Sequence, residues 1–545
     1  MRPYHRLTLA LIIAILAACG PFQVPPTIKA PDEPVLAIPY QDLVVSMLDG
    51  AGKAIVGAEV VTPTHDSRIS DGNGFSHMAV PGQVLVVVSA EGFDTKEIDL
   101  PPKTHRVHLT RTKQTMKRTA QWTGRLSVSK DQRCFQDETG DCQLPVLAHF
   151  GEAFSAYVRR PMEVEAQLVA IKAAGYDGIR FWDTLGYDGA WLNKEVMPWA
   201  FMNKSGQRIP ATLHYYTRLR EFVKTLQAIG LTAHHTRGDL NGRSLNEVVG
   251  HAERVAAIYD DIGWDVMALF EGNNEDFQNG SFGAEGLLRI VGPGARRGAI
   301  TASSCPAGCT EKVEDLKAFT KGFSVFYVHG YRDGEPTDKL RHIFSLGYEA
   351  EAFGDRRLGW QGEPTGPNEF PGFGVTVGHT ENVEELALLA VQSLMSRQVW
   401  VYMSQYGVFW NGRIETHKGF AAVPRMRDVL EKFAPDVMSY SITHGGRGDA
   451  KFKSTTGYYG DPGVSVGPAR IDQAYSKDGQ RVVATVHGGK GPATIRNLMG
   501  CAADVTLVHA NADESVEAHT FRTEANATLA IKYRVGRLLL AQCVQ

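Results

Sequence analysis

A regular alternation of short apolar runs with longer helix-like segments, between residues 143 and 436, constrains the fold of this chain more than any other feature. The runs have the length of buried strands, and the segments between them have the length and apolar spacing of helices. Strands are expected at 145–150, 178–182, 231–235, 266–270, 299–303, 324–328, 357–360 and 399–404. Helices are expected at 162–174, 212–229, 245–262, 312–321, 339–352, 383–397 and 423–433. This order predicts a parallel sheet with crossover helices.

The number of strands decides between two α/β architectures. Eight strands over this length predict a TIM (β/α)₈ barrel, which typically takes about 250 residues. The alternative is an open, doubly wound sheet, which normally carries a glycine-rich phosphate loop after an early strand. The sequence has no such loop. Only the helix between the fourth and fifth strands has no clear pattern.

Strand-like segments flank the barrel on both sides. With 545 residues the chain is too long for one hydrophobic core. Short apolar runs separated by turn residues fill 40–112 and again 437–545, with 113–142 as a linker between the first of these and the barrel. The first stretch resembles the transthyretin-like or carboxypeptidase-regulatory β-sandwich. The expected fold class is therefore multidomain α/β, with a central TIM barrel between two β-sandwiches.

The amino-terminal residues predict export. A basic start and a short apolar run suit a signal peptide over residues 1–18, and the run ends in Leu-Ala-Ala-Cys-Gly at 16–20. This pattern resembles a bacterial lipobox, in which cleavage precedes a cysteine that receives lipid, here Cys19. A proline-rich tether follows over 19–39. Gly20 resembles the outer-membrane sorting pattern, so we expect a lipoprotein of the outer membrane, facing the periplasm or the cell surface. The alternative is an ordinary signal peptide with an incidental cysteine.

The cysteines agree with an oxidising compartment. The chain has seven, and six remain without Cys19. An even number in an exported chain predicts disulfides, although six cysteines permit about fifteen sets of pairs. Neighbours along the chain give the expected set: Cys134 with Cys142, Cys305 with Cys309, and Cys501 with Cys543. A redox or metal pair at Cys305 and Cys309 is the alternative, but the spacing fits neither.

The net charge and the sequence motifs argue against several classes of function. A net charge of −3 without a basic run argues against a nucleic-acid partner. No cofactor is expected. His234 and His235 are adjacent, and neighbouring residues of a strand point to opposite faces, so the two cannot share one metal ion. We therefore expect no metal site there.

Polar and aromatic residues gather at the carboxyl ends of the expected strands, where TIM barrels carry their active sites. Two carboxylates stand out. Glu275 follows Asn274 after the fourth strand, and Glu363 follows the seventh. This arrangement resembles the clan A glycoside hydrolases, a (β/α)₈ superfamily with an Asn-Glu pair after strand four and a Glu after strand seven. The chain differs from that pattern at Asp276, where proline is frequent.

The resemblance implies a retaining glycoside hydrolase that cleaves O-glycosidic bonds by a two-glutamate double displacement. Glu275 would be the general acid/base, Glu363 the nucleophile, and Asn274 the partner of the sugar 2-hydroxyl. Carboxyl groups about 5 to 5.5 Å apart give retention of configuration. The other residues expected to contact substrate, from the strands and the loops that follow them, are Arg180, Trp182, Asp183, His235, Glu271, His329, Tyr331, Trp360 and Trp410.

Two other functions are alternatives to this hypothesis. A surface lipoprotein could bind glycan on a degenerate barrel without cleaving it, but both glutamates are present. A metal-dependent barrel hydrolase would need a His-x-His or similar ligand set early in the barrel, and none is present. The expected substrate is an extracellular or periplasmic oligo- or polysaccharide, and the expected membrane contact is the lipid anchor.

Overall fold

The computed structural model describes the strands between residues 41 and 108 by their backbone, and residues 124–544 apart from several segments. The omitted segments are 186–195, 203–207, 239, 241, 275, 277–281, 305–320, 329–357, 362–381, 404–417, 446, 455–468, 488–492 and 533–534. The chain divides into two compact units, Met1–Lys117 and Arg118–Gln545. The domain boundaries expected from the sequence stay predictions.

The described part of the first unit is entirely strand. One sheet has the order β4-β1-β7 and the other β3-β2-β5-β6. The strands are β1 (Gln41–Leu48), β2 (Glu59–Val61), β3 (Ser67–Ile69), β4 (Phe75–Val80), β5 (Val84–Ser89), β6 (Lys96–Leu100) and β7 (Thr104–His108). Within the first sheet β1 pairs antiparallel with β4 and parallel with β7.

The second unit contains the predicted barrel. Its parallel strands run in the order β17-β16-β15-β12-β11-β20-β19-β18, and each overlaps one of the eight expected from the sequence. The strands are β11 (Val146–His149), β12 (Gly178–Trp182), β15 (Thr232–Thr236), β16 (Met267–Glu271), β17 (Thr301–Ala302), β18 (Phe326–Val328), β19 (Gly359–Gln361) and β20 (Gln398–Met403). The backbone N–H of Ser324, just before β18, donates to the carbonyl of Thr301 at 2.9 Å and brings the two end strands together. The predicted TIM barrel is therefore confirmed.

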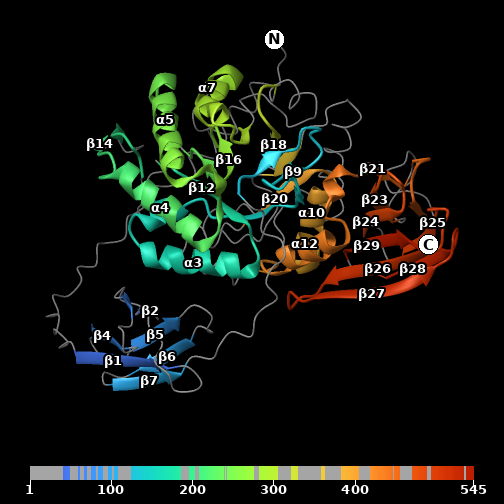
Figure 1. Ribbon diagram of the computed structural model, residues 1–545, viewed down its shortest axis with the longest axis horizontal. Helices are drawn as coiled ribbons and strands as arrows, with labels where there is room; N and C mark the ends of the chain where they lie inside the picture. Colours follow the sequence, from blue (N-terminus) through green and yellow to red (C-terminus); the bar gives the residue numbers. More distant parts are fainter. Residues whose placement is uncertain are drawn as a thin grey trace, which may run out of the picture. The chain divides into compact units, whose positions relative to one another are not determined.

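Helices follow the strands around the barrel (Figure 1). The described ones are α2 (Ala153–Tyr157), α3 (Pro161–Ala174), α4 (Tyr215–Ile229), α5 (Leu245–Ile262), α7 (Gly283–Arg296), α10 (Val383–Met395) and α12 (Ala422–Phe433), with short 3₁₀ turns η1 (Trp264–Val266) and η3 (Val437–Ser439). A small hairpin, β13 (Phe201–Met202) with β14 (Arg208–Ile209), lies between β12 and α4. Among these described helices none is both long enough and apolar enough to span a bilayer.

A small disulfide-bonded sheet belongs to a segment that contacts the amino-terminal end of the barrel, where Arg125 donates to the carbonyl of Arg297 and lies over the ring of Trp264. The sheet consists of β8 (Ser127–Val128), β9 (Phe135–Gln136) and β10 (Cys142–Gln143), in the order β10-β9-β8. Cys134 and Cys142 are bonded, which is one of the three expected pairs. The ring of Phe135 meets the edge of Trp360 inside the barrel at 5.6 Å between centroids. The small sheet therefore contributes Phe135 to the hydrophobic core of the barrel.

The carboxy-terminal residues form two antiparallel sheets. The larger has the order β21-β23-β24-β29-β26-β27 and the smaller β22-β25-β28. The strands are β21 (Ser441–His444), β22 (Phe452–Ser454), β23 (Arg470–Tyr475), β24 (Arg481–His487), β25 (Ala493–Asn497), β26 (Ala503–Ala510), β27 (Val516–Thr523), β28 (Thr528–Ile531) and β29 (Gly536–Cys543). Cys501 is bonded to Cys543, the second expected pair found.

Helices α10 and α12 lie between the barrel and the larger carboxy-terminal sheet (Figure 1). Every residue of α10 is buried, because one face packs on the barrel and the other on this sheet. The Glu514 carboxylate, in the turn between β26 and β27, accepts the backbone N–H groups of Gly419 and Ala421 ahead of α12. The carboxy-terminal sheets are thus built into the same packed unit as the barrel.

Candidate active site

Register along the parallel strands decides which side chains enter the barrel. Arg180 of β12 lies level with His149 of β11 on one side and with His234 of β15 on the other. Residues level with each other in a parallel pair point to the same face, so all three share the interior. Glu271, the last residue of β16, points to the same place. His149 and Glu271 are the last residues of their strands, so the group lies toward the carboxyl ends, where the fold places its active sites.

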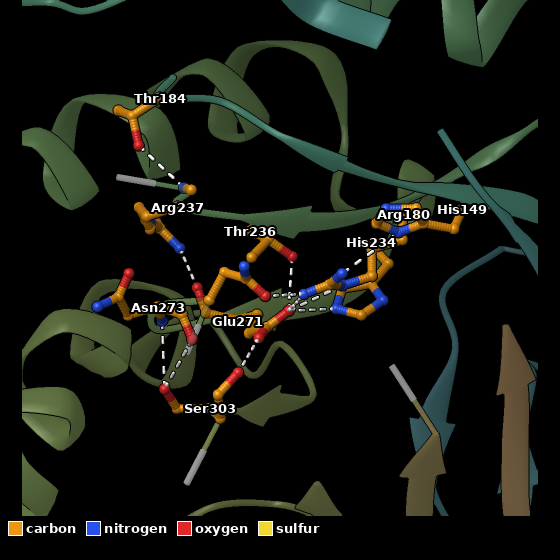
Figure 2. Close-up of polar contacts among 12 residues, drawn as sticks. His149, Arg180, Thr184, His234, Thr236, Arg237, Glu271, Asn273 and Ser303 are labelled. Atoms are coloured by element: carbon orange, nitrogen blue, oxygen red, sulfur yellow. Dashed lines mark hydrogen bonds and ion pairs between the residues drawn. The ribbon is translucent and has the colours of Figure 1, made fainter. Parts of the chain in front are cut away.

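The carboxylate of Glu271 is the centre of this interior cluster (Figure 2). Its Oε2 accepts hydrogen bonds from Nε2 of His234 at 2.7 Å and from Oγ1 of Thr236 at 2.6 Å. Nε and Nη2 of Arg180 both donate to the same oxygen at 3.3 Å. Its Oε1 accepts from the Ser304 hydroxyl at 3.0 Å. A fully buried carboxylate is therefore bound on both oxygens.

These contacts fix the charges of the cluster. Burial by itself would raise the pKa of Glu271, but the charge of Arg180 and the hydrogen bonds from His234 and Thr236 outweigh it and lower the pKa to about 2. Burial lowers the pKa of His234 to about 4, although Glu271 acts in the opposite direction. Near neutral pH the cluster thus holds an ionised Glu271, a charged Arg180 and a neutral His234 that donates from Nε2.

Arg180 connects the cluster to the loop that follows β16. Its Nη2 donates to Oδ1 of Asn274 at 2.7 Å, and its Nη1 lies 3.2 Å from Nδ1 of His149. The backbone N–H of Asn274 donates to the carbonyl of Arg237 at 2.8 Å. The side chain of Asn274 is therefore bound to β12, and its backbone N–H to the residue that follows β15. Glu275 is the next residue in the chain.

Asp276, in the loop after β16, binds the amino-terminal end of α7. Asp276 accepts the backbone N–H of Phe282 at 3.0 Å and that of Gly283 at 3.1 Å, at the beginning of the helix. A carboxylate here satisfies helix N–H groups that have no partner within the helix. Asp276 stands where proline is frequent in the clan pattern, and this contact gives it a structural role.

Two residues expected to face the substrate lie on the outer side of the barrel wall. His235 points away from the interior, and its Nε2 donates to Oδ2 of Asp183 at 2.8 Å. His251 of α5 donates to the same oxygen at 3.0 Å. His235 and Asp183 are fully buried. Alternation along β15 explains this correction to the expectation: with His234 inside, His235 must face the helices.

The charges of this outer cluster are also set by burial. Burial alone would raise the pKa of Asp183, but His251 and His235 outweigh it and hold the pKa far below its usual range. Burial lowers the pKa of His235 to about 4. Asp183 therefore links a strand, a helix and the loop after β12 rather than facing the barrel mouth.

The two tryptophans among the described candidates differ in depth. Trp182 lies at the end of β12, 9% exposed, with its ring edge-to-face against His149 at 5.4 Å. Trp360 is fully buried and meets His234 at 5.5 Å between ring centroids. Trp182 thus lies nearer the solvent, whereas Trp360 belongs to the barrel core and not to an exposed sugar platform.

Several expected residues lie outside the described part of the chain. They are both candidate catalytic glutamates, Glu275 and Glu363, the candidate substrate contacts His329, Tyr331 and Trp410, and Cys19, Cys305 and Cys309. Their places are fixed only by their neighbours in sequence. Glu275 follows Asn274 directly, and Glu363 comes two residues after Gln361, which ends β19.

Sequence reasoning missed four residues of the interior cluster: His149, His234, Thr236 and Ser304. The positions of His234, Thr236 and His149 within their strands carried a signal in the sequence. Thr236 lies two residues after His234, as alternation within one strand requires, and His149 ends the first strand at the same level as Arg180. Ser304 follows a two-residue strand, where alternation gives little guidance. Within the described residues, no group of three or more His, Cys, Asp or Glu side chains is arranged to hold a metal ion.

Comparison with known proteins extends the description of the fold. No family model matches the sequence, and no curated protein matches it. A glycoside hydrolase family 5 structure from Bacteroides vulgatus ATCC 8482 superposes with a TM-score of 0.53 at 13% identity, over 77% of this chain and 95% of its own. A second structure from that strain, assigned to the glycoside hydrolases, gives 0.54 at 11% identity, over 93% and 99%. A third, named a glycoside hydrolase, gives 0.52 at 11% identity, over 77% and 97%. At these identities the likeness establishes a shared fold.

Proposed function

We propose that this chain is a retaining glycoside hydrolase that cleaves O-glycosidic bonds of an oligo- or polysaccharide. The observation that carries the proposal is the hydrogen bond from Arg180 to Asn274 at the carboxyl end of β16, directly before Glu275. This is the position at which clan A barrels carry their Asn-Glu pair, and the barrel fold is shared with glycoside hydrolase structures. The second carboxylate, Glu363, follows β19 at the matching place in sequence.

In the proposed mechanism the two glutamates divide the work. Glu275 protonates the leaving glycosidic oxygen while the carboxylate of Glu363 attacks the anomeric carbon and forms a covalent glycosyl-enzyme. Glu275, then ionised, takes a proton from water, which releases the sugar with its original anomeric configuration. In this mechanism the negative charge of Glu363 would raise the pKa of Glu275 and keep it protonated for the first step.

Asn274 would bind the sugar 2-hydroxyl, a contact that strengthens as positive charge develops at the anomeric carbon. Its amide group is held by Arg180, so the contact would be formed without reorganising the loop. Trp182, 9% exposed at the end of β12 and beside His149, would offer the edge of an aromatic surface to the apolar face of a sugar ring.

The test is covalent trapping. Wild-type protein is incubated with a panel of dinitrophenyl 2-deoxy-2-fluoro-β-glycosides of mono- and disaccharides, and the intact mass is measured. We expect the mass to rise by one glycosyl group, and peptide mapping to find it on Glu363. Glu363→Ala should not be labelled. The exposed Glu221 of α4 supplies the matched control, and Glu221→Gln should be labelled as the wild type is.

Turnover gives the second readout. On aryl glycosides with a poor leaving group, Glu275→Ala should lose about 10²- to 10⁴-fold in kcat/KM, as expected for removal of a general acid. Azide should partly restore its rate on activated substrates. Glycan binding without turnover or labelling would support a non-catalytic glycan-binding barrel instead.

The proposed location is the outer membrane, through lipid on Cys19, so that the substrate is an extracellular or periplasmic glycan. Labelling with radioactive palmitate in a bacterial host should mark the wild type, whereas Cys19→Ala should stay unlabelled and be released from the membrane fraction. A labelled Cys19→Ala protein would contradict the anchor.

A further inference from the structure

Glu271 is a strongly hydrogen-bonded carboxylate inside the barrel, yet the proposed chemistry does not use it. Its two oxygens accept five hydrogen bonds from four side chains, three of them on β12 and β15 and one just after β17. A carboxylate that is fully buried, accepts hydrogen bonds on both oxygens and has a pKa lowered to about 2 has no proton to deliver to a leaving group near neutral pH. Glu271 is therefore neither the general acid nor free to attack a sugar.

The role of Glu271 follows from what it holds. Arg180 is fully buried, and a buried guanidinium needs a fixed negative partner. Glu271 supplies it by accepting from Nε and Nη2 of Arg180, and Nη2 also donates to Oδ1 of Asn274, while Nη1 lies against Nδ1 of His149. The order of contacts is thus Glu271, then Arg180, then Asn274.

The neutral donors make this arrangement rigid. Thr236 and His234 lie on the same strand and fix Oε2 from one side, while Ser304 fixes Oε1 from the other. Because each donor belongs to a strand or to the residues just after one, the carboxylate has one available orientation. Figure 2 shows the contacts from Arg180, His234 and Thr236 converging on Glu271.

We propose that Glu271 is a positioning residue whose negative charge holds Arg180 in place, so that Arg180 orients the carboxamide of Asn274 toward the sugar 2-hydroxyl. The proposal rests on the proposed glycoside hydrolase function. It differs from a purely structural role in one respect: its effect on catalysis must pass through the 2-hydroxyl of the substrate.

The experiment compares one dinitrophenyl glycoside that the wild type hydrolyses with its 2-deoxy counterpart. Glu271→Gln keeps the shape and removes the charge. We expect it to lower kcat/KM on the 2-hydroxy substrate by about 10- to 100-fold, the scale of one lost charge-assisted hydrogen bond. On the 2-deoxy substrate the loss should be less than about 3-fold, because the contact is already absent. Combining Glu271→Gln with Asn274→Ala should cost no more than Asn274→Ala alone.

A second variant keeps the test decisive if Glu271→Gln folds poorly. Arg180→Lys retains a positive charge beside Glu271 but loses the planar fork that reaches Asn274. It should show the same selective loss on the 2-hydroxy substrate, while Glu221→Gln should behave as the wild type on both substrates.

Two results would overturn the proposal in different ways. Equal losses on the two substrates, in a wild type that is trapped on Glu363, would mean that Glu271 serves only the fold. A wild type that neither hydrolyses nor is labelled by any glycoside of the panel would remove the proposed function and this inference with it.

Discussion

Replacing Asp472 by Asn should destabilise the barrel, although Asp472 belongs to the carboxy-terminal sheet. Its carboxylate is fully buried and accepts from Nε of Arg470 at 2.8 Å and from Nε2 of His487 at 3.0 Å. Gln392 of α10 donates to the same oxygen at 3.1 Å, so the contact joins the sheet to the barrel layer. Removing one partner of a buried ion pair typically costs about 3 to 5 kcal/mol.

The same sheet offers a matched control. Asp504 and Arg522 form a pair of the same chemistry, but their side chains are 50% and 58% exposed. An exposed pair contributes less than about 1 kcal/mol, so Asp504→Asn should change stability little. The contrast between the two Asp→Asn variants isolates burial, because the substitution is identical.

Tryptophan fluorescence is the assay, because all eight tryptophans lie between residues 122 and 410 and none in the carboxy-terminal sheets. A thermal or urea transition followed this way reports the barrel and its surroundings. Asp472→Asn should shift that transition clearly to lower temperature or denaturant, and Asp504→Asn should leave it within error. If the tryptophan transition of Asp472→Asn stays unchanged while circular dichroism shows the sheets melting first, the carboxy-terminal sheets are an independent domain and the reasoning is refuted.

Three further predictions concern stability elsewhere in the unit. His234 and His235 have pKa values lowered to about 4 in the folded protein, against about 6.5 in the unfolded chain. Between these two pH values the unfolded chain binds more protons than the folded protein. The free energy of unfolding should therefore fall as the pH falls from about 6.5 to about 4, by up to about 3 kcal/mol for each histidine. A melting temperature that stays flat from pH 7 to pH 4.5 would contradict this. Gly294→Ala should destabilise by about 1 to 2 kcal/mol, since an added Cβ would lie 2.8 Å from the buried ring of Phe270. Gly250→Ala, with open space around its Cβ, should instead stabilise by about 0.5 to 1 kcal/mol, and both are measured by the same fluorescence transition.

The barrel could be predicted from the sequence because its signals are local. Each strand is a short apolar run and each described helix that was expected begins within three residues of its predicted start. Helix α7 has no clear sequence pattern, because it contains Pro293 and four glycines, of which Gly283 is its first residue. Both residue types are poor helix formers. Tertiary packing explains why it forms: Gly294 lets the helix approach Phe270, whose ring would lie 2.8 Å from an added Cβ.

The carboxy-terminal sheets show a limit of a different kind. Their strands at 481–486, 504–508 and 528–531 could be predicted from apolar runs, and the structure has strands at each. Their attachment to the barrel could not. It depends on contacts such as Gln392 with Asp472, which join residues 80 positions apart, and local patterns carry no information about them.

The site shows how a shift of one residue changes the chemistry assigned to a strand. The sequence pattern predicts the third strand at 231–235, which would place its last residue, His235, at the barrel mouth. In the structure β15 ends at Thr236, and His234 is the interior residue. Charge balance supplies a criterion that the apolar pattern lacks. A buried Arg180 requires a carboxylate on the same interior face, and Glu271 meets that need only if both side chains enter the barrel. The histidine level with Arg180 then has to be His234, because level residues of parallel strands share a face. Charge balance and strand register together therefore place His235 against the helices.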